Sequence, residues 1–144
     1  MKAIDHLHMP ELLSNEYPVQ LSDTEQETYK QFKSELILEM QDTEITAANA
    51  AALSNKLSQL ANGAVYDDTG AVIPIHSRKL DALEDLIEAT NGKPVLVAYW
   101  FKHDRTRIAE RLQRLRVSYQ EIQSSDSIRN WNARRLQVGL LHPA

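Results

Sequence analysis

The sequence predicts an α/β fold in which helices flank a mostly parallel sheet in three layers. The first observation is that residues 95–99 (VLVAY) are apolar or aromatic at every position, as in a strand that helices cover on both faces. The second is that strand-like and helix-like segments alternate from residue 93 onward, in the order strand, helix, strand, helix, strand. This alternation favours right-handed crossovers and a parallel sheet.

We expect the 144 residues to form one domain, with a helical segment and a small hairpin in residues 1–75 and the α/β core in residues 76–144. Residues 17–21 alternate weakly and predict a short strand, at an edge because Pro18 has no N–H to donate. Ser22 and Glu25 form a capping box. The helix that they open carries an apolar stripe made of Tyr29, Phe32, Leu36, Ile37 and Met40.

A second helix is predicted from Thr46 to about Ala61, with Leu53, Leu57 and Leu60 on its buried edge. Gly63 ends it, because glycine readily takes the left-handed conformation that follows a helix. Residues 64–66 and 71–73 then flank a turn that contains glycine, which predicts a β-hairpin.

In the α/β core, Ser77 is the expected cap of a third helix, with one apolar face made of Leu80, Leu83, Leu86 and Ile87. Residues 95–99 form the first strand and residues 100–104 a short turn, after which Asp104 caps a helix that runs to residue 115. Residues 117–122 and 136–141 are the other two strands. Between them Asp126 is expected to cap a short helix.

Composition limits the classes of function. The hydrophobic content of 42% is ordinary for a globular protein, no apolar run is long enough to span a membrane, and the absence of cysteine excludes disulfides and thiolate metal sites. We therefore expect a cytoplasmic protein. The net charge of −4 argues against strong nucleic-acid binding by the whole surface, although bases outnumber acids between Lys102 and Arg116. That cluster is either a solvated helix face or a local phosphate-facing patch.

Several kinds of catalytic site are excluded. The four glycines build no phosphate-binding loop, and the sequence has none of the common hydrolase or metalloprotease motifs. His6 and His8 lack further metal ligands and fit a surface segment better. Asp67 and Asp68 leave open a metal-dependent nuclease, although adjacent acids in a turn make a poor metal cage.

Four segments together resemble one family. They are residues 16–29 (EYPVQLSDTEQETY), 53–66 (LSNKLSQLANGAVY), 76–104 (HSRKLDALEDLIEATNGKPVLVAYWFKHD) and 126–144 (DSIRNWNARRLQVGLLHPA). They are similar to the second RecA-like domain of Swi/Snf-type superfamily-two DNA helicases, in the phage or prophage form. The third segment contains the family's motif IV. One departure is Arg134, which stands where the family usually has glycine, so we expect a turn that tolerates a side chain there.

The resemblance implies part of an ATP-dependent motor. ATP and Mg²⁺ would bind the parent protein between this domain and a first RecA-like domain, and DNA would be the other partner. The family's motifs V and VI do not follow, so we expect a severed domain that holds no cofactor and is inactive alone. The resemblance also assigns a DNA-side surface, formed by Tyr99, Trp100, Lys102, His103, Ser124 and Ser125.

Tyr99 has an alternative role in core packing, and Phe101 shares it. The alternative function is a non-enzymatic α/β binding or dimerisation module. An exposed sheet edge or the alanine-rich helix would then join two copies.

Overall fold

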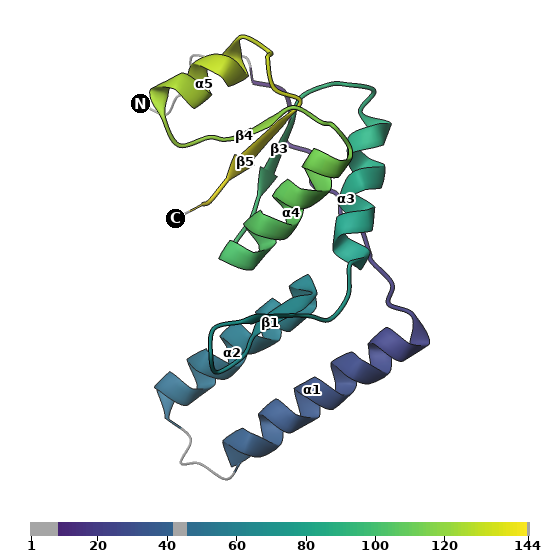
Figure 1. Cartoon of the computed structure of the whole chain (residues 1–144), viewed down its shortest axis with the longest axis vertical. Helices are drawn as coiled ribbons and strands as arrows, with labels where there is room; N and C mark the ends of the chain where they lie inside the picture. Colours follow the sequence, from purple (N-terminus) through teal and green to yellow (C-terminus); the bar gives the residue numbers. More distant parts are fainter. Residues whose placement is uncertain (1–8, 42–45, 144) are drawn as a thin grey trace.

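The computed structural model describes residues 9–41 and 46–143. Its helical part comprises α1 (Asp23–Gln41), α2 (Ala47–Asn62) and a hairpin of β1 (Ala64–Tyr66) and β2 (Val72–Pro74). The α/β part comprises α3 (Arg78–Ala89), β3 (Val95–Ala98), α4 (Lys102–Arg114), β4 (Tyr119–Glu121), α5 (Ser125–Asn132) and β5 (Val138–Leu141). The predicted division at residue 75 falls in the loop between β2 and α3. Figure 1 shows the helical part below the α/β part.

The sheet of the α/β part is parallel, as predicted. Its strand order is β3-β5-β4, so β5 enters between the two earlier strands. Val95 is paired with Val138 on one side of β5, and Tyr119 is paired with Val138 on the other. All three strands therefore end at the same edge of the sheet, called here the carboxyl edge.

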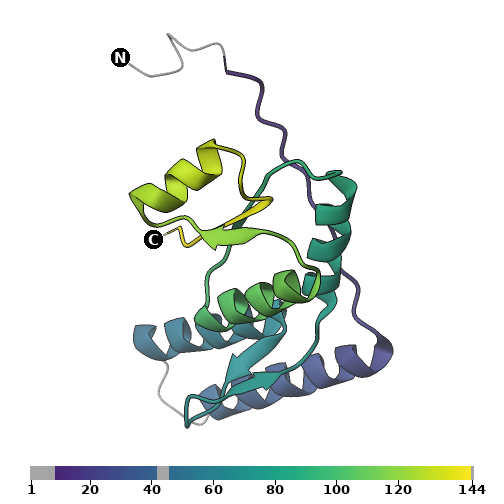
Figure 2. The same ribbon diagram turned by 45° about the horizontal axis from the view of Figure 1, so that its top comes forward.

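Helices lie on both sides of the sheet, which confirms a three-layer α/β arrangement. Figure 2 shows α4 on one side of the strands and α5 on the other. The main core joins α3, α4 and the sheet, and its buried side chains are Ile87, Tyr99, Ile108, Leu112, Val138 and Leu140. On the α5 side, a Cβ on Gly139 would lie 3.0 Å from Ile122 and 3.1 Å from both Leu96 and Trp131, so only glycine fits without a shift of neighbours.

The expectation that β3 is buried on both faces is wrong. Val95 and Val97 point toward the core, whereas Ala98 is exposed and Leu96 is 53% exposed. The reason is the strand order, because β3 is an edge strand and α5 lies over β4 and β5 instead. An apolar sequence pattern shows that both faces of a strand can be buried. The strand order and the positions of the helices decide which of those faces is covered.

The local helix signals in the first half are confirmed. The Ser22 N–H donates to Glu25 Oε2 at 2.8 Å, and the Glu25 N–H donates to Ser22 Oγ at 3.3 Å. Thr46 caps α2 by accepting from the Asn49 N–H at 3.2 Å. Gly63 follows α2 with φ 97°, in the left-handed region. The predicted stripe of α1 is its half-buried face.

Other local predictions need correction. Residues 17–21 form no strand, because no neighbouring strand pairs with them. Strand β2 is shifted by one residue from the predicted 71–73, and β4 covers only the middle of the predicted 117–122. Ser77 precedes α3 but its side chain makes no capping bond, and Leu86 is 43% exposed because it lies on the outer flank of α3. His6 and His8 lie outside the described residues.

Candidate nucleic-acid interface at the carboxyl edge

The chain leaves β3 and enters α4 almost at once. Lys102 already begins the helix, so the predicted turn at residues 100–104 is shorter than expected. Asp104 is not the N-cap but the third helical residue. Its Oδ2 accepts a hydrogen bond from the Phe101 N–H at 3.2 Å and so satisfies the exposed amide from inside the helix. This places Trp100 and Phe101 as the only two residues between Tyr99 and the helix.

Trp100 is an exposed aromatic at this edge, with 58% of its surface accessible. Its ring stacks on His142, which follows β5, with centroids 5.8 Å apart and an interplanar angle of 24°. His142 Nε2 also lies 3.1 Å from the Trp100 carbonyl oxygen. The exits of two neighbouring strands therefore build one aromatic surface, called here the Trp100 platform (Trp100 and His142). Sequence reasoning did not single out His142, because its partner lies 42 residues away.

Tyr99 lies beneath the platform and is buried. Its hydroxyl donates to the carboxylate of Glu121 at the end of β4, and Arg105 Nε donates to the other carboxylate oxygen at 2.9 Å. Burial, together with the Glu121 hydrogen bond, raises the pKa of Tyr99, and the Tyr99 and Arg105 hydrogen bonds lower the pKa of Glu121. Tyr99 is thus a neutral donor that ties β3 to β4, and its side chain faces the protein.

His103 is also buried, with a side chain that is 0% exposed. Its ring stacks on Phe101 and meets the edge of Tyr66, at centroid distances of 5.3 Å and 5.0 Å. Its Nδ1 lies 3.1 Å from Asp104 Oδ1. Burial is the largest cause that lowers the pKa of His103 and favours the neutral ring. A buried imidazole does not reach a surface ligand, so its place in the DNA-side surface is corrected to support from below.

The other residues of the predicted surface are exposed. Lys102 opens α4 beside Trp100, and Ser124 and Ser125 follow β4 at the same edge. Ser124, rather than the predicted Asp126, is the N-cap of α5: its Oγ accepts from the Ser127 N–H at 3.2 Å. Ser125 is the first residue of α5. The structure therefore keeps Trp100, Lys102, Ser124 and Ser125 on the surface, while Tyr99 and His103 lie inside.

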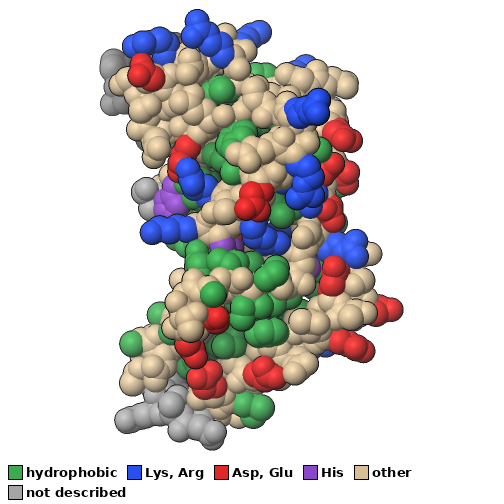
Figure 3. Space-filling view, viewed as in Figure 1, with side chains coloured by type: hydrophobic (Ala, Val, Ile, Leu, Met, Phe, Trp, Pro, Cys, Tyr) green, Lys and Arg blue, Asp and Glu red, His purple; other side chains and the backbone are tan. Residues whose placement is uncertain are grey.

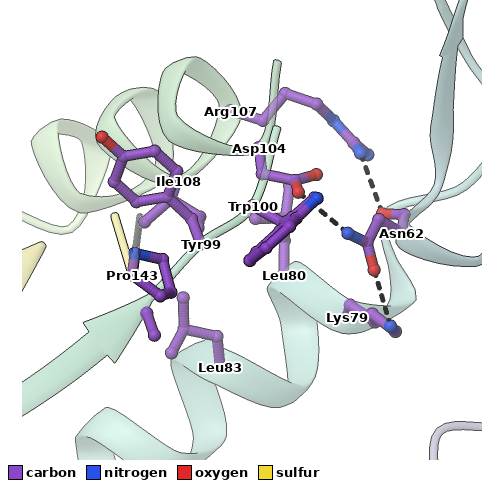
Figure 4. A pocket seen from close by; sticks show the side chains of 11 residues that line it. Asn62, Lys79, Leu80, Leu83, Tyr99, Trp100, Asp104, Arg107, Ile108 and Pro143 are labelled. Carbon is purple, nitrogen blue, oxygen red and sulfur yellow. Dashed lines mark hydrogen bonds between the residues drawn. The ribbon is translucent and has the colours of Figure 1, made fainter. Parts of the chain in front are cut away.

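A cavity of about 390 Å³ opens next to Trp100, between α2, α3 and α4. Leu80, Leu83, Ile108 and Pro143 form its apolar wall. Figure 4 shows Lys79, Asn62 and Asp104 joined by hydrogen bonds at its polar end.

Asn62 is the centre of this polar end. Its Nδ2 donates to Asp104 Oδ2 at 2.8 Å, and its Oδ1 accepts from Lys79 Nζ at 2.8 Å. The Asn62 carbonyl accepts from Arg107 at 3.1 Å, and the same guanidinium donates to the His76 carbonyl at 2.5 Å. These bonds fasten the helical part to the first turns of α3 and α4. From the sequence alone, Asn62 was only the last residue before a helix stop.

Of the two hairpin acids, Asp67 is explained by turn formation. Asp67 Oδ1 accepts from the Thr69 N–H at 2.9 Å, the Thr69 hydroxyl at 2.7 Å and the Ala71 N–H at 2.9 Å. These bonds, the Thr69 side chain first, lower the pKa of Asp67. Across residues 9–41 and 46–143, no group of three His, Asp or Glu side chains is arranged to hold a metal ion. No helix in these ranges has the length and apolar character to cross a membrane.

Comparison with known proteins identifies one similar sequence. The chain is 34% identical over 149 aligned residues to protein p41 of Acyrthosiphon pisum secondary endosymbiont phage 1. The alignment covers 100% of this chain but 31% of p41, so the chain spans about a third of that relative's length. No protein-family model matches the sequence. No solved structure matches it either.

Proposed function

We propose that this chain is part of the second motor domain of an ATP-dependent DNA helicase or translocase, with a RecA-like fold. The observation that carries the proposal is the exposed Trp100 platform, with Lys102 beside it, where β3 ends in a parallel sheet. Sheets of this kind bind ligands beyond the carboxyl ends of their strands. The four segments that resemble the helicase family add support.

In this proposal each exposed residue makes a different contact with the DNA. Trp100 stacks on a base or sugar, with His142 holding its ring, and base–aromatic stacking of this kind contributes about 1–3 kcal/mol. Lys102 supplies a point charge for a phosphate, and the hydroxyl of Ser125 offers a hydrogen bond to the same backbone. Tyr99 and His103 hold the chain beneath Trp100 and Lys102, where they fix the position of both residues.

The nucleotide would bind between this domain and a first RecA-like domain that carries the phosphate-binding loop. Because ATP contacts both domains only when they close, binding and hydrolysis switch the pair between two arrangements. The chain has no phosphate-binding loop of its own. A motor of this class also depends on an arginine at the transferred phosphate, worth about 10³-fold or more in rate. This chain alone should therefore hydrolyse nothing.

The test is to express the complete reading frame that contains this chain and to measure ATP hydrolysis with and without DNA. The proposal predicts hydrolysis that DNA stimulates, and weaker stimulation in Lys102→Ala. The matched control is Lys30→Ala, an exposed lysine on α1, which should leave stimulation unchanged. A complete protein that binds no ATP, or whose hydrolysis ignores DNA, contradicts the motor assignment.

One observation favours a different class of function, a non-enzymatic dimerisation module. Edge strand β3 exposes Leu96 on an uncovered face, and such edges pair readily with another chain. Sedimentation of wild type and Leu96→Glu separates the two functions. If the wild type is a dimer and Leu96→Glu dissociates it, the dimerisation module is supported. If both proteins are monomers, the module is contradicted, and we infer that the edge of β3 pairs with other strands of the complete motor.

A further inference from the structure

The amino edge of the parallel sheet, opposite the Trp100 platform, carries a second unusual surface. Three loops meet there, namely the segments 90–94, 115–118 and 133–137 that lead into β3, β4 and β5. Within the described residues, the non-glycine positions with positive φ all lie in these loops. They are Asn91 (φ 51°), Arg116 (φ 57°) and Arg134 (φ 55°).

A groove of about 440 Å³ lies between the first and third of these loops. Its charged lining residues are Lys93, Arg134 and Arg135, and no carboxylate lines it. The amides of Asn91 and Gln137 add polar groups to the wall. We call this surface the amino-edge groove.

The three cations of the amino-edge groove are not neutralised by the protein. None of them forms an ion pair with a carboxylate in the described parts of the chain. Arg135 makes a long hydrogen bond of 3.3 Å to Asn130 Oδ1, a neutral amide. By contrast, Arg78, Arg105 and Arg111 elsewhere in the fold all hold acidic partners.

The positive charge at this end is local and does not follow from composition. The chain has a net charge of −4. Figure 3 shows Lys and Arg side chains at the end of the molecule that holds α5 and the amino edge, beside an acidic side chain. Further Lys and Arg side chains are mixed with Asp and Glu over the middle, and Asp and Glu also follow the α3 side and the α1 end. A concentrated positive groove on an acidic protein attracts a polyanion to that one place.

Arg134 combines a positive charge with a left-handed backbone. A left-handed backbone costs a non-glycine residue about 1 kcal/mol or more, and glycine avoids that cost. Arg134 adopts φ 55° with an exposed side chain. Strain held at a surface position is a reason to look for function there, and a guanidinium in a groove of cations suits phosphate oxygens.

We propose that the amino-edge groove binds the phosphodiester backbone of a nucleic acid, as a contact separate from the Trp100 platform. The positive charges and the loop geometry of the groove are observed whether or not the chain belongs to a motor. The choice of nucleic acid over other polyanions rests on the proposed function. A strand that runs from one edge of the sheet to the other would be held at two places on this domain.

The test exploits the strained backbone. Arg134→Gly removes one charge and relieves the left-handed strain, so it should keep or raise the melting temperature while it weakens DNA binding. Binding is measured by fluorescence anisotropy with labelled single-stranded and duplex DNA over a series of salt concentrations. We expect about 2- to 5-fold weaker binding and a salt slope reduced by about one, since one phosphate contact is lost. Lys93→Gln/Arg135→Gln should lower the slope by about two.

The matched control is Lys30→Gln/Lys33→Gln, which removes two exposed charges from α1 at the opposite end of the molecule (Figure 1). Its binding should stay within about 2-fold of wild type, because the charges lie beyond the reach of direct contact. Equal losses in the control and groove variants, or wild-type binding by Arg134→Gly, would overturn the proposal.

Competition separates the sources of negative charge. Unlabelled DNA should displace the labelled strand at far lower charge concentration than poly-glutamate or inorganic phosphate. Equal displacement by poly-glutamate makes the groove a site for acidic protein, and displacement by millimolar phosphate makes it a small-anion site, and both contradict the proposal. Failure of the motor assignment gives a different result. The complete protein would then show no DNA-stimulated ATP hydrolysis, while Arg134→Gly would still weaken DNA binding.

Discussion

The side-chain amide of Asn62 donates a hydrogen bond of 2.8 Å to Asp104 Oδ2 and so joins the end of α2 to the first turn of α4. Asp104 in turn holds the Phe101 N–H and lies against the buried His103. The helical part and the exit of β3 are therefore one connected unit. The position of Trp100 therefore depends on Asn62, which lies 42 residues before its partner Asp104, as well as on its own strand.

Asn62→Ala tests this connection. The change leaves Lys79 and one oxygen of the buried Asp104 without their Asn62 partner, so we expect the free energy of unfolding to fall by about 1–3 kcal/mol. Urea denaturation measures it. Asn132→Ala, at an exposed position on α5, is the control and should change stability by less than about 0.5 kcal/mol. Similar values for the two variants would show that the Asn62 bonds add little.

Substitution of Gly63 and of Gly70 distinguishes the cost of backbone strain from the cost of steric overlap. Both have positive φ, 97° and 83°, but a Cβ on Gly63 would lie 2.3 Å from the His76 carbonyl oxygen, whereas a Cβ on Gly70 meets nothing within 4 Å. Gly70→Ala should cost about 1 kcal/mol from φ alone. Gly63→Ala should cost about 3 kcal/mol or more, because the backbone must move as well. Thermal unfolding of both variants checks the difference, and equal costs would rule out the close approach.

The Glu25–Arg78 pair predicts a pH dependence. The hydrogen bond from Arg78 is the main cause that lowers the pKa of Glu25 from 4.5 to about 2, with further help from Ser22. A lowered pKa in the folded state stabilises the protein above pH 4.5, and this contribution is lost as the pH falls toward 2. The stability difference between wild type and Glu25→Gln should therefore shrink as the pH is lowered from 7 to 3.

Glu27→Gln, at an exposed position on the same helix, is the reference for this titration. Its difference from wild type should stay small over the whole range. If the Glu25→Gln difference stays constant or grows at low pH, the ion pair is not the source of its effect.

Signals confined to a few neighbouring residues were read correctly from the sequence. Ser22 with Glu25, Thr46 with its helix and Gly63 at a helix end each use hydrogen bonds that close within four residues. The sequence spacing alone therefore sets the geometry. The parallel sheet was also predicted correctly, although its strands pair over long stretches of sequence. Here the reason is different: alternating strands and helices with short crossovers leave few other topologies.

Predictions that needed a partner elsewhere in the chain were less successful. Residues 17–21 had a strand pattern but no strand to pair with, and Leu96 had a buried pattern but no covering helix. The platform and the polar cluster at Asn62 escaped notice because each joins residues 42 positions apart. The predicted DNA-side surface is only partly exposed. The family resemblance placed Tyr99 and His103 beside Trp100 on that surface, but it did not show that these two side chains are buried.

The central claim is that DNA contacts the carboxyl edge at Trp100. The most direct measurement uses a Trp131→Phe variant, in which Trp100 is the remaining tryptophan, and follows its fluorescence during titration with single-stranded DNA. We predict quenching that saturates with the anisotropy signal, because the ring stacks on a base, and that persists in Arg134→Gly with a weaker apparent affinity. DNA binding that leaves the Trp100 emission unchanged would contradict the account.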